Sequence, residues 1–312
     1  MTLTVLRTAE SWWLQTPSGA ARIATPATTT AGLLADRDAV RAAASSHEAV
    51  PVDTLDLVSP ITRPCRVVAQ MTNYASHVRD SGMNPDSVPL TFFRKSSASI
   101  TGPYDDIVKP AHVRLLDYEV EIGLVIGREI SAGTAISADR LADYIAGLVV
   151  TNDVSARDVQ LPQTQFYEAK SYPSFTPAGP ALVLLDDDEL ARFGELRLRL
   201  RVNGELRQDM LVDGDMLYRP AEALQSLARF QDLSAGDLIL TGTPVGTALS
   251  APPKPVEMIG ALLPPAVKWR AFFKRQAGNR RYLRHGDVVE ASIFTDDGAI
   301  DLGHQRNTVR FA

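Results

Sequence analysis

The chain has 312 residues, of which 45% are hydrophobic and 22% charged, and its formal net charge is −5. These values are typical of a globular protein with a large core, and the acidic excess argues against nucleic acid or an anionic membrane as a partner. The single cysteine, Cys65, excludes an internal disulfide and a thiolate-rich metal site. Because there is no signal-peptide pattern and no apolar run of ~18 residues, we expect a cytoplasmic protein.

Residues 1–62 are predicted to form a small N-terminal α/β domain. Strand-like segments at 12–14 and 20–23 flank a turn, and a helix is expected over 31–44. Prolines then mark an extended linker, and no residue of this part suggests chemistry. The remainder, 63–312, is predicted to form the main domain.

An acidic strand at 117–127 is the first candidate for a functional site. Asp117, Glu119 and Glu121 alternate with apolar residues, so they would share one face of a strand. Unpaired carboxylates on one face repel each other. Either lysines and arginines pair with them, as on many exposed strands, or they bind a divalent cation that prefers oxygen, Mg²⁺ or Mn²⁺ before Zn²⁺.

His77 and Asp80 are the second candidate. Three residues apart on a helix, they would share a face, and a carboxylate beside an imidazole orients the ring and raises its pKa, which suits a general base. A surface pair without a catalytic role is the alternative.

Further along the chain, a buried strand at 146–150 leads into Asp153 and Arg157, and strand ends of this kind often bind ligands.

Most of the chain after residue 66 is predicted to be strand. Strict alternation precedes the hairpin signal Asn203-Gly204, and a later strand runs into a glycine-rich loop. This loop lacks the spacing and the lysine of a phosphate-binding loop, so it is expected to present Thr241 or Thr243 to a pocket. Strands punctuated by turns at short spacing predict an α+β, β-rich fold built on a rolled sheet or barrel.

Seven motifs follow one another in this part of the chain. They are Asn73-Tyr-x-x-His77, Phe93-x-Lys95, Asp117-Tyr-Glu119-x-Glu121, Asn152-Asp153-x-Ser-Ala-Arg157-Asp-x-Gln160, Ala-Lys170-Ser, Gly179-Pro180 and Thr241-Gly-Thr243-Pro-x-Gly246. In this order they resemble the catalytic domain of the fumarylacetoacetate hydrolase family. The resemblance covers roughly residues 60–312 and implies a mixed β-roll or barrel that forms a homodimer.

The resemblance also implies a divalent cation, Mg²⁺ or Mn²⁺ with Ca²⁺ as a substitute in crystals. Its ligands would be Glu119, Glu121 and Asp153, since these match the two glutamates and the aspartate of the family. Asp117 matches no ligand, so it is expected beside the ligands and not among them.

The catalytic roles implied by the resemblance fall on three residues. His77 would be a general base on a mobile lid, oriented by Asp80, and Lys170 would be an electrostatic or proton-donating group at the developing oxyanion. The positions expected to contact the substrate are Tyr74, Arg157, Gln160, Thr241 and Thr243.

A first departure from the family bears on the expected function. Seven residues before His77, where true fumarylacetoacetases carry a further carboxylate ligand, this chain has Gln70, so it looks closer to the acylpyruvase, oxaloacetate decarboxylase and isomerase branches. The main expectation is metal-dependent hydrolysis of a C–C bond in a small anionic substrate, a 2,4-dioxo acid, acylpyruvate or β-diketone, in aromatic or related catabolism. The alternative is a decarboxylase, hydratase or isomerase that acts on a 2-oxo acid through the same metal-stabilised enolate. A non-catalytic binding protein is disfavoured, because the carboxylates, His77 and Lys170 are all present.

The second departure is an insertion at 250–284. It has eight basic residues and one acidic residue, while the rest of the chain is acidic. Pro264-Pro265 is expected to start a helix that Gly278 ends. The insertion is expected to pack on the core, to pad a homodimer interface or to close the edge of the site beside an anionic substrate.

Overall fold

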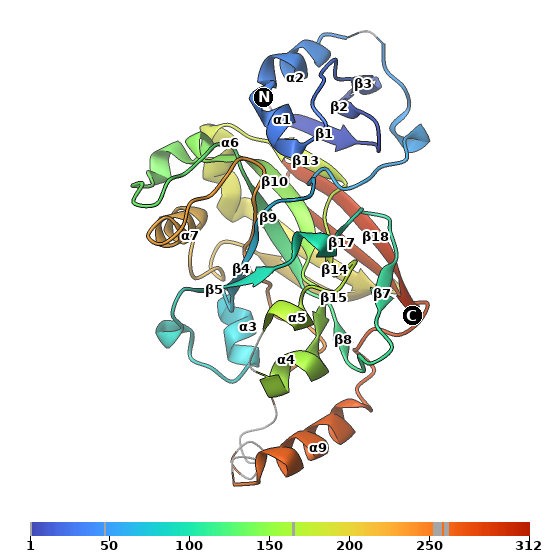
Figure 1. Ribbon diagram of the computed structural model, residues 1–312, viewed down its shortest axis with the longest axis vertical. Coiled ribbons are helices and arrows are strands. Elements are labelled where there is room, and N and C mark those ends of the chain that lie inside the picture. Colours follow the sequence, from blue (N-terminus) through green and yellow to red (C-terminus); the bar gives the residue numbers. More distant parts are fainter. Residues whose placement is uncertain (1, 47, 164–165, 252–257, 259–261) are drawn as a thin grey trace.

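The computed structural model describes residues 2–46, 48–163, 166–251, 258 and 262–312, and most of its strands lie in two large sheets (Figure 1). The first sheet contains β1 (Leu3–Arg7), β2 (Trp12–Thr16), β3 (Gly19–Arg22), β4 (Val67–Met71), β5 (Thr91–Lys95), β9 (Val120–Ile126), β10 (Ile145–Asn152), β13 (Ala181–Leu184) and β16 (Leu238–Leu240). The second contains β7 (Ile107–Lys109), β14 (Leu196–Val202), β15 (Glu205–Leu211), β17 (Val288–Thr295) and β18 (Asp301–Phe311). Two short pairs complete the set, β6 (Ile100–Thr101) with β12 (Thr176–Pro177) and β8 (Leu116–Asp117) with β11 (Ser155–Ala156).

The two large sheets are both open and both mixed, since each contains one parallel pair of strands, β4 with β16 and β7 with β18. The nine-stranded sheet runs in the order β3-β2-β1-β13-β10-β9-β16-β4-β5, and the five-stranded sheet in the order β15-β14-β17-β18-β7. The α+β, β-rich fold predicted from the sequence is therefore confirmed, as two open sheets and not a closed barrel in the part of the chain that is described.

Each face of the nine-stranded sheet has its own core. On one face Ile122 and Leu124 of β9 belong to a core shared with Leu198 of the five-stranded sheet. On the other face Val125 belongs to a core shared with Leu33 from the N-terminal helices. Because β9 is buried on both faces, any charged side chain at its ends must find a partner within the protein.

The N-terminal segment joins the large sheet through β1, which pairs antiparallel with β13. The two strands expected in this segment are confirmed as β2 and β3. The expected helix is present as two, α1 (Thr30–Ala35) and α2 (Arg37–Ala43), because the backbone of Asp36 leaves helical geometry between them. A separate domain that ends at residue 62 stays a prediction.

The remaining helices belong to the part after residue 66. They are α3 (Ala75–Asp80), α4 (Arg157–Gln163), α5 (Phe166–Ala169), α6 (Asp187–Ala191), α7 (Pro220–Leu227) and α9 (Pro265–Gln276), with 3₁₀ turns at Val52–Thr54, Pro85–Ser87, Ser97–Ser99, Ala138–Asp143 and Arg192–Glu195. Figure 1 shows α3, α4 and α5 below the sheets and α9 beyond them at the end of the molecule. None of the helices in the described ranges has the length and apolar character needed to cross a membrane.

Candidate metal centre

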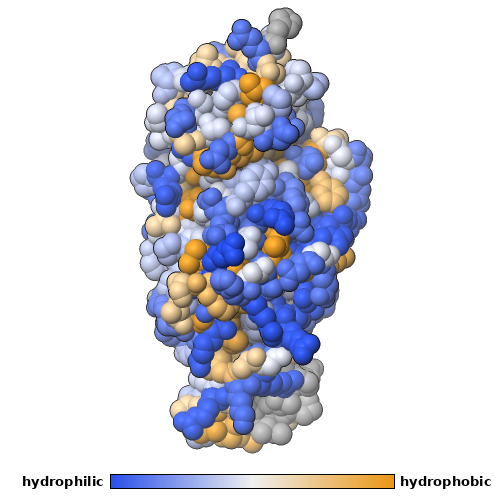
Figure 2. Space-filling model, turned by 90° about the vertical axis from the view of Figure 1, so that its right-hand side faces the viewer, coloured by the Kyte–Doolittle hydropathy of each residue, from blue (hydrophilic) through white to orange (hydrophobic). Residues whose placement is uncertain are grey.

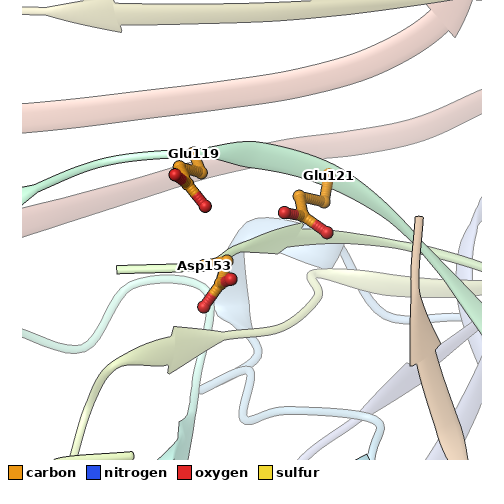
Figure 3. Close-up of side chains that lie close together, drawn as sticks. All are labelled: Glu119, Glu121 and Asp153. Atoms are coloured by element: carbon orange, nitrogen blue, oxygen red, sulfur yellow. The ribbon is translucent and has the colours of Figure 1, made fainter. Parts of the chain in front are cut away.

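Glu119, Glu121 and Asp153 come together at the ends of two neighbouring strands (Figure 3). Glu119 precedes β9, Glu121 lies on it and Asp153 follows β10, and the two strands pair antiparallel with Thr151 opposite Glu121. One oxygen atom of each carboxylate lies within 4.8 Å of the others, and all three residues are buried. The three predicted ligands therefore form one cluster.

The acidic segment is not one continuous strand, and that prediction is wrong. β8 ends at Asp117 and β9 begins at Val120. Between them the N–H of Tyr118 donates to Asp117 Oδ1 at 2.9 Å, and the N–H of Glu119 donates to Asn152 Oδ1 at 2.9 Å. The N–H groups of Tyr118 and Glu119 thus donate to side chains and not to the backbone of a neighbouring strand. Asp117 lies outside the cluster of three.

Buried basic side chains neutralise two of the three carboxylates. Lys170 Nζ lies 2.5 Å from Glu119 Oε2 and 2.6 Å from Asp153 Oδ2. Lys95 also pairs with Asp153, and Arg157 pairs with Glu119. Of the three acidic residues of the predicted strand, Glu119 and Asp117 thus pair with basic side chains, as one of the two interpretations expected, but they are buried and do not form an exposed face.

Glu121 is the member of the cluster for which the described residues provide no ion pair. Its Oε2 accepts a hydrogen bond from the N–H of Gly242 at 2.7 Å. Burial, together with the nearby Asp153 and Glu119, raises the pKa of Glu121 well above its usual value. Burial would also raise the pKa of Glu119, but the neighbouring cations outweigh it and hold that pKa below its usual range. Without a metal ion, burial and the two neighbouring carboxylates therefore favour the protonated form of Glu121, while the neighbouring cations favour the ionised form of Glu119.

The donor atoms of this cluster fit a hard divalent cation. All three are carboxylate oxygens that lie within 4.8 Å of one another, and the cluster contains no thiolate or imidazole from the described residues. Oxygen ligands of this kind suit Mg²⁺ or Mn²⁺ better than Zn²⁺. A bound ion would replace the proton on Glu121 and offset the charge that this carboxylate then carries.

Asp117 anchors Arg157 and the loop that follows β16. Arg157 Nε donates to Asp117 Oδ2 at 2.8 Å, and the backbone N–H groups of Ala248 and Leu249 donate to the same carboxylate at 2.7 and 3.1 Å. Arg157 Nη1 also donates to Gln160 Oε1 at 2.8 Å. The arginine and the glutamine expected to contact substrate are therefore adjacent and held in place.

His77, the expected general base, lies on α3 near the charged cluster. Burial lowers its pKa, and the negative charge of Glu119 opposes this effect. Its Nδ1 atom is buried without a hydrogen-bond partner among the described residues. No described hydrogen bond or ion pair joins the side chain of Asp80 to this ring, while the backbone oxygen of Asp80 accepts from the N–H of Ala251 at 3.0 Å. The roles of His77 and Asp80, and the mobile lid, stay predictions.

The hydroxyl groups of the expected substrate-contacting residues differ in how they are bonded. Tyr74 OH and Thr241 Oγ1 are both buried, and the two side chains lie beside each other, so that Thr241 lowers the pKa that burial of Tyr74 raises. Thr243 Oγ1 donates to the backbone oxygen of Val120 at 2.9 Å and accepts from Gln208 Nε2 at 2.8 Å. Thr243 therefore ties its loop to β9.

The sequence reasoning assigned no role to Lys95 or Gln208. Lys95 stands in one of the quoted motifs, but its partner Asp153 is 58 residues away in the chain. Gln208 lies on β15, where no local pattern indicates a contact with Thr243. Gln70 does not join the cluster, because along β4 it shares a face with Val68, which packs in the core between the sheets.

Residues 66–310 match the model of a family described as fumarylacetoacetate (FAA) hydrolase, C-terminal. This range is most of the chain, and it includes the carboxylate cluster and the basic residues around it. The chain belongs to this family, as the resemblance of its motifs predicted. It is thus a member of an enzyme family, and its own buried acidic cluster suits a metal ion.

Three proteins with known names or structures are similar to this chain. The chain is 36% identical over 214 residues to "Oxaloacetate tautomerase Fahd2a, mitochondrial" of Rattus norvegicus, a match that covers 68% of this chain and 66% of the relative. It is 37% identical over 205 residues to "Oxaloacetate tautomerase YisK" of Bacillus subtilis (strain 168), covering 64% and 65%. Among solved structures, a probable 2-hydroxyhepta-2,4-diene-1,7-dioate isomerase from Mycobacterium abscessus aligns with a TM-score of 0.73 at 32% identity, covering 100% of this chain and 99% of that one. The match thus spans less than two thirds of the length of either curated relative.

Proposed function

We propose that this protein is a metal-dependent isomerase that interconverts the keto and enol forms of a small 2-oxo dicarboxylic acid of the oxaloacetate type. The observation that carries the proposal is the buried carboxylate cluster in which Glu121 has no described basic partner. Glu119, Glu121 and Asp153 would hold one Mg²⁺ or Mn²⁺ ion there. The names of the rat and B. subtilis relatives support isomerisation over hydrolysis.

The side chains around the cluster have the properties that this reaction needs. When bound, the ion would supply the positive charge that stabilises an enolate. Arg157, fixed by its buried partners, would bind a carboxylate of the substrate. His77, neutral because burial lowers its pKa, would take the proton from C3 of the keto form. Burial would lower the pKa of Lys170, but its carboxylate partners raise it, so Lys170 would stay protonated and give a proton to the C2 oxygen.

Hydrolysis of a C–C bond is the second candidate, and it is the main function expected from the sequence. The description of the family as a hydrolase supports it. It needs more than proton transfer, because His77 must also activate a water molecule with the help of Asp80. Since no described contact joins these two side chains, isomerisation is the better supported of the two.

The test uses enolic oxaloacetate, whose ultraviolet absorbance falls as the keto form appears. We expect the protein with Mg²⁺ or Mn²⁺ to accelerate this change, EDTA to abolish the acceleration, and pyruvate to form no faster than with the metal ion alone. The variant Glu121→Ala should be inactive, while Asp38→Ala, which removes an exposed carboxylate, should behave as the wild type. Release of pyruvate faster than with the metal ion alone, or cleavage of an acylpyruvate without faster tautomerisation, would contradict the proposal and favour a decarboxylase or a hydrolase.

A further inference from the structure

The helix α9 and the segment after it form an arm, residues 262–284, at one end of the molecule (Figure 1). The expected helix is confirmed, because α9 begins at Pro265 and ends at Gln276, and none of its 12 residues is buried. Other calls on the insertion, including the charges of Lys254 and Glu257, lie outside the described residues. The expectation that the insertion pads a homodimer interface stays a prediction.

The arm has positive charge that no carboxylate of the described residues neutralises. It contains no acidic residue and seven basic ones, all of them exposed: Lys268, Arg270, Lys274, Arg275, Arg280, Arg281 and Arg284. Within the described ranges, none of the seven forms an ion pair. Arginines elsewhere differ, since Arg192, Arg197 and Arg199 each pair with aspartate or glutamate. Figure 2 shows hydrophilic side chains beside apolar ones at this lower end of the molecule.

The rest of the chain is strongly acidic. The whole chain has 32 basic and 37 acidic residues, and the insertion takes eight of the former and one of the latter, which leaves 24 basic against 36 acidic residues. A surface with this balance repels an approaching anion. The 2-oxo dicarboxylic acid proposed above has two negative charges at neutral pH, so its approach is unfavourable everywhere except near the arm.

The insertion begins and ends beside elements of the proposed active site. The N–H of Ala251, at its start, donates at 3.0 Å to the last backbone oxygen of α3, the helix that carries His77. The N–H of Leu283, at its end, donates at 2.9 Å to the backbone oxygen of Leu116 on β8, the strand that ends at the carboxylate partner of Arg157. The positive arm therefore projects from the part of the molecule in which these groups lie.

Side-chain contacts fix the arm relative to the site. Asn279 Nδ2 donates to the backbone oxygen of Ala248 at 2.9 Å, and Arg281 Nη2 donates to that of Gly246 at 2.7 Å. Both acceptors belong to the loop after β16, which also contacts the carboxylate cluster through the N–H of Gly242. The positive charges thus keep one position beside the loop that borders the site.

We infer that the arm is an electrostatic guide that raises the local concentration of a doubly charged substrate at the site without touching the reacting atoms. The inference rests on the proposed function, because it concerns the charge of the same substrate. The arm attracts each negative charge separately, so a dianion gains twice the free energy of a monoanion. The attraction extends over the Debye length, which is ~30 Å in about 0.01 M salt and ~3 Å in about 1 M salt. Preference for dicarboxylates over monocarboxylates should therefore be largest at low salt.

Steady-state kinetics on enolic oxaloacetate at two ionic strengths test this inference. In about 0.01 M salt, Arg270→Glu/Lys274→Glu should lower kcat/KM at least ~3-fold through KM, with kcat unchanged, and in about 1 M salt it should match the wild type. Arg270→Gln/Lys274→Gln removes half as much charge, so its factor should be the square root of the first. The control Arg22→Glu/Arg41→Glu changes the net charge equally on exposed residues at the other end of the molecule and should keep the wild-type KM.

Binding without turnover separates this inference from the proposed function. Malate and lactate share a 2-hydroxy acid group, and malate has a second carboxylate, so calorimetry on the Mn²⁺-loaded protein compares a dianion with a monoanion. In about 0.01 M salt, Arg270→Glu/Lys274→Glu should weaken malate binding by the square of the factor for lactate. The same variant should bind Mn²⁺ more tightly, because the wild-type arm repels a cation, whereas a damaged fold would bind it more weakly.

Two results would overturn the inference. One is an equal loss of affinity for malate and lactate in the arm variant, which would indicate a direct contact in place of long-range attraction. The other is an equal effect of the arm variant and the Arg22→Glu/Arg41→Glu control, which would make the position of the charge irrelevant. If the malate pattern holds and tautomerisation is not accelerated, the proposed function fails and the electrostatic guide stands.

Discussion

Replacement of Asp117 by alanine should destabilise the protein strongly although this residue binds no metal. Its buried carboxylate accepts from the side chain of Arg157 and from the N–H groups of Ala248 and Leu249. Removal of one partner of a buried ion pair costs ~3–5 kcal/mol, and a buried N–H left without an acceptor costs ~1–3 kcal/mol. Since Arg157 keeps Glu119 as a partner, we expect a total loss of about 3–5 kcal/mol.

Urea unfolding of the metal-free protein, followed by circular dichroism, measures this loss. Asp117→Asn keeps one carbonyl acceptor and loses the charge, so its loss should be smaller, about 1–3 kcal/mol. Asp38→Asn is the matched control, because this aspartate pairs with Arg41 on the surface and its side chain is 97% exposed. If Asp117→Ala unfolds at the same urea concentration as Asp38→Asn, the carboxylate is not the anchor described above.

Three further predictions concern single titratable groups. The pKa of Glu121 is raised in the folded chain, so the folded state binds the extra proton and the metal-free protein should lose stability as pH rises above about 4.5, the ordinary value. Glu121→Gln should flatten that profile in urea titrations at several pH values, and an unchanged slope would show that another group causes it. His77→Ala should abolish turnover while calorimetry shows unchanged Mn²⁺ binding, and Asp80→Asn should lose less; full activity of His77→Ala would assign the base elsewhere. Burial raises the pKa of Cys65 to about 12, so iodoacetamide at pH 8 should label it far more slowly than free glutathione, and equal rates would contradict its burial.

The cluster of three carboxylates could be predicted because its signal is local. Glu119 and Glu121 stand two apart before and within β9, and Asp153 directly follows β10, the buried strand that pairs with β9. The break between Asp117 and Val120 could not be predicted, because it depends on Asn152, a side chain from another strand. A periodic pattern predicts which residues face the same way only while the strand continues.

The basic residues around the cluster were harder to place. Lys170 and Arg157 appeared as parts of motifs, but nothing in their spacing indicated that both would bind Glu119. Such contacts are set by tertiary packing between segments that are far apart in the sequence.

The helix at 265–276 was predicted almost to the residue, since two prolines and a glycine mark its ends.

The buried lysine and arginine partners of the cluster allow the protein to stay folded when no ion is bound. In many small metal-binding domains the chain folds only once the ion arrives. Here Lys170, Lys95 and Arg157 already pair with Glu119 and Asp153, and burial favours the neutral form of Glu121. The ion-free chain should therefore remain folded. The proposed activity should then rise and fall with the free Mg²⁺ or Mn²⁺ concentration, without synthesis of new protein.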